Sequence, residues 1–256
     1  MTHAAPRHIV IVGATSSIAE RCARRWLAAG GVRQLTLIGR GAERLESLAA
    51  DLRIRAGADT QVRSLAGDLL DAGGIERLLD QACQSGPPDL ALIAHGHLPD
   101  QQQAQQDLAL AGDALRVNAV SPALFAEGLA TRMAAAGQPA TLGLIGSVAG
   151  DRGRKSNYIY GAAKGLLERY AEGLQHRLAA TAVRVCLIKP GPTATPMTAH
   201  LQGGQGAALA DPDQVAADIV RGLAAGKAVI YTPIKWRPIM AVVRRLPRAV
   251  FHKLNI

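Results

Sequence analysis

The chain of 256 residues is long enough to bury a large core, and its 48% hydrophobic and 19% charged residues exclude disorder throughout. The net charge of +9 would suit a nucleic-acid partner, but aromatic residues make up only 3% of the chain, so the stacking surfaces of single-strand binders are missing. No helix-turn-helix or zinc-finger spacing appears either, and we expect no nucleic-acid partner.

Apolar runs of strand length alternate with segments of helical period along the chain. We expect strands at 8–13, 34–39, 62–66, 90–94, 141–146, 183–188 and 229–231. We expect helices at 16–29, 42–56, 74–84, 108–136, 157–179 and 211–225, with a short helix at 197–201. This alternation is typical of parallel strands covered by helices on both faces. It predicts an α/β, doubly wound Rossmann fold with a seven-stranded parallel sheet in one domain, 1–232, followed by a basic tail, 233–256.

The first expected strand ends in the loop Gly13-Ala14-Thr15-Ser16-Ser17-Ile18-Ala19. Gly13 suits a tight turn, and the free amides and positive dipole end of the following helix suit a phosphate. Ser17 stands where close approach of a pyrophosphate usually requires glycine, although its hydroxyl can donate a hydrogen bond to a phosphate oxygen. We predict cofactor contacts at Gly13, Thr15, Ser16, Ser17 and Ile18, with an ordinary strand-to-helix turn as the alternative.

Arg40 follows the second expected strand, where an NAD-selective protein commonly places an acid for the ribose 2′-hydroxyl. A guanidinium matches a 2′-phosphate instead, and Arg44 follows one helical turn later. The pair favours NADP(H) over NAD(H), and a solvated surface charge is the alternative. At the ends of the next two strands we expect further cofactor contacts, beside the adenine and the nicotinamide ribose, from Asp68, Leu69, Ala94 and Gly96.

No metal site is expected. His95 and His97 flank Gly96, but two histidines without a third nearby ligand are more typical of structural or substrate-facing positions. The cysteines lie far apart and show no metal-ligand spacing: Cys22, Cys83 and Cys186. They fit buried thiols in a reducing cytoplasm. Since the first eight residues form no apolar signal core and no run approaches the ~18 apolar residues that span a bilayer, we expect a cytoplasmic protein.

Tyr160 and Lys164 are four residues apart in Tyr160-Gly161-Ala162-Ala163-Lys164, with Ser147 thirteen residues upstream of the tyrosine. On a helix, positions i and i+4 share one face, so a phenol and an ammonium would project side by side. A nearby cation stabilises a phenolate and lowers its pKa from about 10 toward the working range of proton transfer. The alternative is a chance spacing on a solvated helix.

Residues spread over the whole chain resemble the short-chain dehydrogenase/reductase family in order and spacing: Gly13 to Ala19, Asp68, Gly96, Asn118, Ser147, Tyr160, Lys164 and Pro190-Gly191. The resemblance implies a catalytic tetrad of Asn118, Ser147, Tyr160 and Lys164. It implies cofactor contacts from Tyr160, Lys164, Pro190, Gly191, Thr193 and Thr195, the last at the nicotinamide carboxamide. It also implies a homodimer or homotetramer built on the two long central helices. The family's usual Asn-Asn-Ala-Gly after strand four reads Ile93-Ala94-His95-Gly96 here.

These residues predict the reduction of a ketone by NADPH. Tyr160 would protonate the forming alkoxide, and Ser147 would hydrogen-bond the same oxygen. Lys164 would lower the pKa of Tyr160 and bind the nicotinamide ribose. Asn118 would hold a water linking Lys164 to solvent, or else be a buried asparagine satisfied by the backbone.

Two charged segments bear on the substrate. In the first, 151–155, basic groups would meet a substrate phosphate at the pocket mouth, or simply be solvated. The second, 235–256, carries six Lys and Arg, no acid and interleaved apolar residues, and we expect Pro238 and Pro247 to divide it into short helices. It suits either an anionic membrane surface, with each charge contributing about 1 kcal/mol, or packing against its own domain or a partner subunit.

A narrower resemblance within the family, to reductases of decaprenylphosphoryl-2-keto-ribose, is carried by 150–160, 197–201 and 233–256. It implies a keto-sugar on polyprenyl phosphate, a peripheral location on the inner face of the cell membrane, and a flavin-dependent oxidase partner. A soluble ketone or alcohol is the alternative substrate. A sensor or scaffold that binds NADP without turnover is the alternative from another class, against which Ser147, Tyr160 and Lys164 argue.

Overall fold

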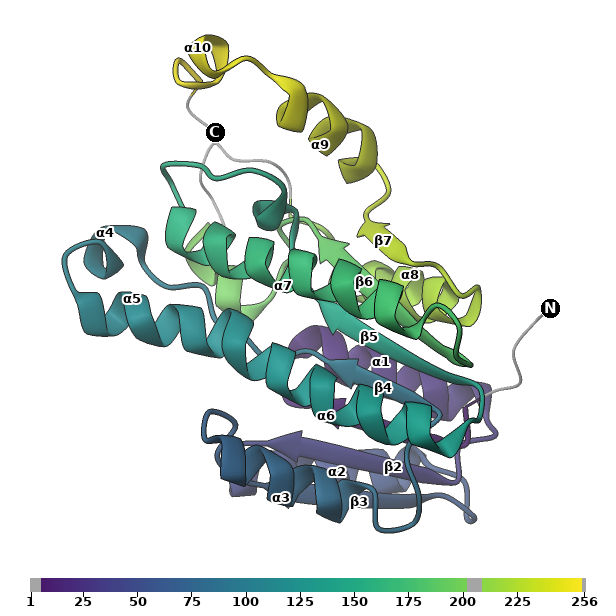
Figure 1. Ribbon diagram of the computed structural model, residues 1–256. Coiled ribbons are helices and arrows are strands. Elements are labelled where there is room, and N and C mark those ends of the chain that lie inside the picture. Colours follow the sequence, from purple (N-terminus) through teal and green to yellow (C-terminus); the bar gives the residue numbers. More distant parts are fainter. Residues whose placement is uncertain (1–5, 202–208, 255–256) are drawn as a thin grey trace.

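The computed structural model describes residues 6–201 and 209–254, and one seven-stranded sheet forms its centre (Figure 1). The strands are β1 (His8–Val12), β2 (Gln34–Gly39), β3 (Gln61–Ala66), β4 (Leu90–Ile93), β5 (Ala140–Ile145), β6 (Val183–Pro190) and β7 (Val229–Thr232). They run parallel in the spatial order β3-β2-β1-β4-β5-β6-β7. The predicted doubly wound, seven-stranded parallel fold is confirmed.

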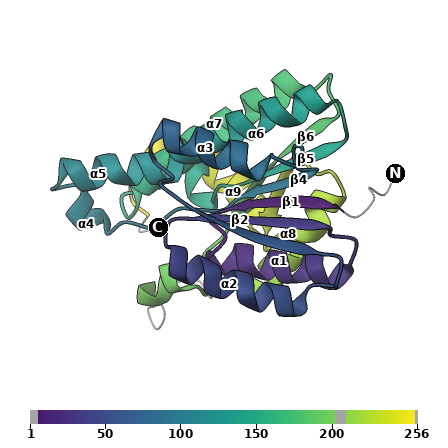
Figure 2. The ribbon, with the colours of Figure 1, turned by 90° about the horizontal axis from the view of Figure 1, so that it is seen from below.

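Helices cover both faces of this sheet, as Figure 2 shows. On one face lie α1 (Ser17–Ala29), α2 (Ala42–Arg55) and α8 (Pro212–Ala224), and on the other lie α3 (Ala72–Ala82), α6 (Ser121–Ala136) and α7 (Tyr158–Leu178). Successive side chains of β1 enter the two cores in turn, Ile9 and Ile11 on the α1 side, Val10 and Val12 on the α6 side. Burial on both faces explains the continuous apolar runs of the strands.

Capping aspartates set several helix starts. The Asp71 carboxylate accepts a hydrogen bond from Gly74 N at 2.6 Å, so α3 begins at Ala72, two residues before the expected start. Asp107 accepts from two backbone amides in the same way at the start of α5 (Leu108–Leu115). The short α4 (Gln101–Ala104), which the pattern did not predict, also begins at an aspartate, Asp100.

The long helical region expected at 108–136 is confirmed, but it is not one regular α-helix. Between α5 and α6 the chain forms a π-helix, Arg116–Val120, whose wider turn shifts the facing of the side chains that follow. Such bulges occur mostly at functional sites, and this one contains Asn118. Two short 3₁₀ helices, at Val148–Asp151 and Pro196–Leu201, complete the loops after β5 and β6.

The basic tail packs against the domain through α9 (Trp236–Arg245), where Met240 is buried, and continues into α10 (Arg248–Phe251). Pro247 separates the two helices as expected. Pro238 does not divide the segment, because it lies in the first turn of α9, where a missing amide hydrogen breaks no helical hydrogen bond. Of the helices built by residues 6–201 and 209–254, none is long and apolar enough to cross a membrane.

Candidate active site

A cleft of about 400 Å³ opens at the carboxyl ends of the strands, where the strand order reverses between β1 and β4. In open α/β sheets this switch point is where ligands bind, because adjacent loops leave the sheet in opposite directions. Loops after β1, β2, β3, β4, β5 and β6 all contribute to its wall, together with the first turns of α7.

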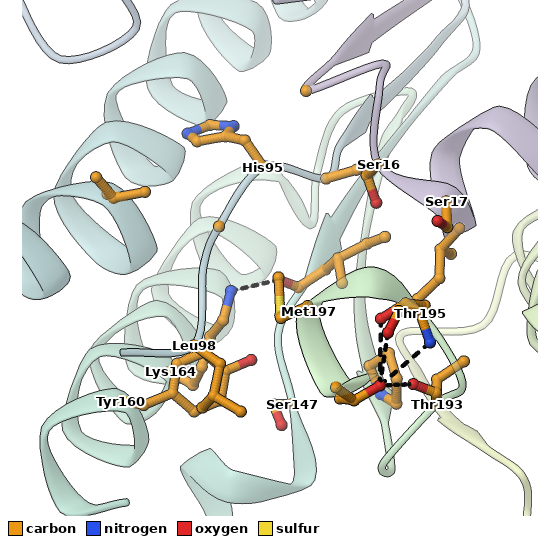
Figure 3. Close-up of a pocket in the computed structure, with 18 of the residues that line it drawn as sticks. Ser16, Ser17, His95, Leu98, Ser147, Tyr160, Lys164, Thr193, Thr195 and Met197 are labelled. Carbon is orange, nitrogen blue, oxygen red and sulfur yellow. Dashed lines mark hydrogen bonds between the residues drawn. The ribbon is translucent and has the colours of Figure 1, made fainter. Parts of the chain in front are cut away.

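The loop after β1 lines the cleft with all five of its predicted residues: Gly13, Thr15, Ser16, Ser17 and Ile18. Gly13 has φ +74°, and a Cβ there would lie 2.5 Å from the backbone nitrogen of His95, so both the conformation and the close approach require glycine. Ser16 is the N-cap residue of α1, yet its side chain makes no capping hydrogen bond. The hydroxyls of Ser16 and Ser17 are therefore placed at a helix N-terminus that suits an anion (Figure 3).

The next two strand ends contribute unequally. Arg40 and Arg44 line the cleft after β2, and Arg44 Nη2 donates to the backbone oxygen of Thr15 at 3.3 Å. After β3 Leu69 lines the cleft, whereas Asp68 does not. The Asp68 carboxylate instead accepts from Leu70 N at 2.8 Å. A local turn thus uses one oxygen of this carboxylate, and the contact of Asp68 with the cofactor stays a prediction.

Four predicted residues after β6, together with Ala94 and Gly96 after β4, also line the cleft: Pro190, Gly191, Thr193 and Thr195. Thr198, which the pattern did not single out, organises this loop, because its hydroxyl donates to Thr193 O and accepts from Thr195 N. A Cβ on Gly191 would lie 1.9 Å from the indole nitrogen of Trp236. The tail helix α9 therefore supports the loop from outside.

Ser147, Tyr160 and Lys164 meet in this cleft (Figure 3). Ser147 follows β5, and its hydroxyl accepts from Ala149 N at 3.1 Å. Tyr160 and Lys164 come from the first turns of α7, and the ammonium lies 5.7 Å from the centre of the phenol ring. Lys164 Nζ donates to Ile145 O at 3.0 Å. The three groups that the sequence predicted thus share one pocket.

The electrostatics of this trio differ from the sequence-based expectation. Burial raises the pKa of Tyr160 to about 12, and only the Ser147 hydroxyl opposes this rise. Burial also lowers the pKa of Lys164 to about 8. The expectation that Lys164 lowers the pKa of Tyr160 is not met here, because desolvation dominates. At neutral pH Tyr160 carries its proton and is suited to act as an acid.

Asn118 does not line the cleft but lies directly behind it. The residue is fully buried, Oδ1 accepts from His97 N at 3.0 Å, and Nδ2 donates to Ala114 O at 2.9 Å. A Cβ on Gly96 would fall 2.7 Å from Asn118 Oδ1 and 3.6 Å from Lys164 Nζ. Glycine at position 96 therefore allows the amide and the ammonium to approach one another.

His95 is a residue of the cleft that sequence reasoning left without a role. Its Nε2 lies 2.8 Å from the Ser121 hydroxyl, which itself donates to Leu69 O. The Ser121 oxygen must then accept, so Nε2 carries the imidazole proton and the buried Nδ1 is an unpaired acceptor among the described residues. Burial lowers the pKa of His95 to about 3, so the ring is neutral. The sequence did contain a signal for this residue, because His95 replaces the alanine of the family's usual Asn-Asn-Ala-Gly segment.

The charged residues of the loop at 151–155 make different contacts. Asp151 is buried and binds Lys189, and Arg152 donates to Val243 O and to Leu246 O at the end of α9. Neither lines the cleft, so the expectation that both would sit at its mouth is wrong. Arg154 does line it, as does Asn157, which the pattern identified only as a helix start. Lys155 is exposed. Leu98 and Met197 complete the wall near Tyr160 (Figure 3).

Comparison with known proteins agrees with this geometry. A sequence profile described as short chain dehydrogenase matches residues 7–206. An uncharacterized oxidoreductase of Mycobacterium tuberculosis is 36% identical over 99% of this chain and 98% of its own. A short chain dehydrogenase of Burkholderia cenocepacia, solved in complex with NADP, superposes with a TM-score of 0.80 at 17% identity, covering 98% of both chains. An actinorhodin polyketide ketoreductase solved with NADPH gives 0.76 at 22% identity, covering 88% of this chain and 95% of that one.

These features define an oxidoreductase of the dinucleotide-dependent class. They are a parallel sheet with a glycine turn at its switch point, and a tyrosine, a lysine and a serine in the cleft beside that turn. The chain belongs to the short chain dehydrogenase family, as the profile match and the 36% identical relative show.

Proposed function

We propose that the protein is an NADPH-dependent ketoreductase. The observation that carries the proposal is the convergence of Ser147, Tyr160 and Lys164 in one cleft with a nucleotide-type loop. The two similar structures that were solved with NADP and with NADPH support a nicotinamide dinucleotide as the cofactor. Arg40 and Arg44 at the cleft wall support NADP(H) over NAD(H), since a guanidinium fits a 2′-phosphate.

The described residues fit this dinucleotide. The loop after β1 offers backbone amides and two serine hydroxyls at a helix N-terminus, and Thr193 and Thr195 also line the cleft. When bound, the reduced dinucleotide supplies hydride to a carbonyl carbon. Tyr160, protonated at neutral pH, gives its proton to the oxygen of that carbonyl. Ser147 donates to the same oxygen, a contact worth ~2.7–4 kcal/mol when it is aimed at developing charge.

Lys164 and Asn118 complete the proton path in this proposal. Lys164 binds the nicotinamide ribose with the ammonium that now donates to Ile145 O. Asn118, buried beside Gly96, holds a water through which the Tyr160 proton is replaced. The rate can be measured as a function of the deuterium fraction in mixed H₂O and D₂O. A linear plot, which indicates that a single proton moves, would contradict a relay through this water.

We infer as substrate a keto-sugar carried by polyprenyl phosphate, reached at the inner face of the cell membrane. The tail supports this location, because its exposed apolar residues Ile239, Val242 and Val250 alternate with exposed cations. A separate flavin-dependent oxidase would form the ketone. A coupled assay in which NADPH is consumed by the oxidase product, and not by the alcohol before oxidation, tests that order.

We also infer a homodimer or homotetramer. Exposed leucines on α5 and α6 support it, namely Leu108, Leu110, Leu115 and Leu124. Sedimentation equilibrium of wild type and Leu108→Glu, whose parent side chain is 89% exposed, tests it. A monomer at all concentrations would overturn this inference.

Tyr160→Phe tests the reductase proposal itself. The variant keeps the ring and its packing but removes the proton donor, so reduction of a ketone by NADPH should fall on the order of 10²- to 10⁴-fold while NADPH still binds. Fluorescence titration measures the binding, and NADPH absorbance measures turnover. Unchanged turnover would overturn the proposed acid, and an NADPH-binding wild type that turns over no ketone would favour a non-catalytic sensor.

A further inference from the structure

The wall of the cleft contains four cations, and three of them are accounted for. Arg40 and Arg44 lie at the β2 end, where the dinucleotide phosphate is expected, and Lys164 donates to Ile145 O. The fourth, Arg154, lines the cleft from the loop between Ser147 and Tyr160, the two residues beside which a substrate would lie. Its role is not explained by the fold.

Arg154 has unused hydrogen-bonding capacity. Its Nε is buried without a partner among residues 6–201 and 209–254, and no described carboxylate forms an ion pair with it. Asp151 is the carboxylate whose charge acts on Arg154, but its oxygens bind Lys189 and Tyr231. Burial lowers the pKa of Arg154, and the charge of Asp151 opposes this shift without cancelling it.

Asn157 provides a second observation at the same place. It is the N-cap residue of α7, but its side chain makes no capping bond, and its buried Oδ1 has no partner in the described structure. Asn157 N donates to Arg154 O at 3.1 Å, so one turn presents both side chains to the cleft. The partly buried guanidinium offers N–H donors that suit an oxyanion, whereas the unpartnered Oδ1 of Asn157 is an acceptor and suits a hydrogen-bond donor on the same ligand.

We propose that Arg154 binds a singly charged oxyanion on the ketone substrate. One guanidinium balances one negative charge, such as that of a phosphodiester or a carboxylate, and the apolar Leu98, Val148 and Met197 nearby would receive the uncharged part. This inference rests on the proposed reductase function and narrows its substrate to anionic ketones. The exposed Lys155 on the same loop takes no part.

Two matched pairs of ketones, each with one singly charged member, test the proposal with the NADPH-loaded enzyme: acetoacetate against methyl acetoacetate, and levulinate against methyl levulinate. Wild type should have the higher kcat/KM on the charged member of each pair. In Arg154→Ala the ratio of kcat/KM between the charged and uncharged ketones should fall by about tenfold to hundredfold, because a charge-assisted hydrogen bond is removed. The fall should come from a higher KM for the charged ketone. Arg154→Lys should keep part of the preference and Lys155→Ala all of it. Equal preference in wild type and Arg154→Ala overturns the proposal.

A second measurement needs no turnover. Saturating NADP⁺ occupies the dinucleotide part of the cleft, and dimethyl phosphate or acetate is then added while the thermal midpoint is recorded. The midpoint should rise for wild type and Lys155→Ala but not for Arg154→Ala, and the larger rise identifies the phosphodiester or the carboxylate. The absence of any rise in wild type overturns the anion site. If the midpoint rises through Arg154 while none of the four ketones is reduced, the anion site stands and the reductase proposal fails.

Discussion

The ammonium of Lys189 lies 2.7 Å from a carboxylate oxygen of Asp151, and both side chains are buried. Glu168 lies on the other side of the same ammonium, at 2.9 Å. Lys189 immediately precedes Pro190 of the cofactor loop, Asp151 ends the 3₁₀ turn after Ser147, and Glu168 is one helical turn beyond Lys164. One buried cation thus fixes the three segments that form the cleft.

Lys189→Met should destabilise the fold by about 3–5 kcal/mol, since it leaves two buried carboxylates without their shared partner. Urea denaturation measures this change. The control is Arg33→Ala, which breaks the exposed pair with Asp59 and should cost about 1 kcal/mol or less. A similar small loss in both variants would show that Lys189 does not hold these segments together.

Trp236→Ala should weaken NADPH binding several-fold without changing the residues that line the cleft. The indole packs on Gly191, so its removal leaves the loop after β6 unsupported. Ile239→Ala on the same helix is the matched control, because Ile239 is 41% exposed. Fluorescence titration of both variants decides the matter, and equal affinities would mean that α9 does not position the loop.

Removal of the Arg40 guanidinium after β2 should reduce the preference for NADPH over NADH. Arg40→Ala should bind NADPH at least about tenfold more weakly and NADH unchanged, because the 2′-phosphate loses a charge-assisted hydrogen bond while the bond from Arg44 to Thr15 O stays in place. Titration with both dinucleotides measures the ratio. Tighter binding of NADH than NADPH by wild type would contradict the assignment.

The pH dependence of stability should reveal the buried Lys164. Burial lowers its folded pKa to about 8 from 10.5, so the unfolded chain binds the proton more tightly between these values. Stability contributed by this group therefore rises with pH in that window. Relative to Lys164→Met, wild type should gain about 1 to 2 kcal/mol from about pH 8 to about pH 9.5. Cys22 and Cys186, whose pKa values burial raises to about 12, are common to both proteins and cancel. A flat difference in urea unfolding would contradict the shift.

The membrane proposal requires substitutions rather than removal of the tail, because Arg152, Trp236 and Met240 tie α9 to the domain. Val242→Asp/Val250→Asp should reduce sedimentation with phosphatidylglycerol vesicles while the protein stays folded. Ile54→Asp, a change at an 86% exposed position on α2, is the control. Undiminished sedimentation of the double variant would remove the tail from membrane binding.

The sequence and the structure differ most where the chain departs from regular periodicity. A uniform helical pattern at 108–136 conceals the π-helix that presents Asn118, since one inserted residue hardly alters an apolar spacing. Asp68 matched the family spacing, but whether a carboxylate faces a cleft or its own loop depends on local hydrogen bonds that spacing does not encode.

The sequence by itself determined the fold and the trio of Ser147, Tyr160 and Lys164 that we propose to be catalytic, because strand and helix periods report which faces are buried and an i, i+4 pair shares a helix face wherever the helix lies. Only the tertiary structure decided the protonation of that trio, since desolvation of Tyr160 and Lys164 depends on what packs around them. Only the tertiary structure decided the positions of the Asp151, Arg152 and Arg154 side chains, which the sequence shows simply as a run of charged residues. Long-range partners on β6 and α9 occupy the first two and leave the third facing the cleft.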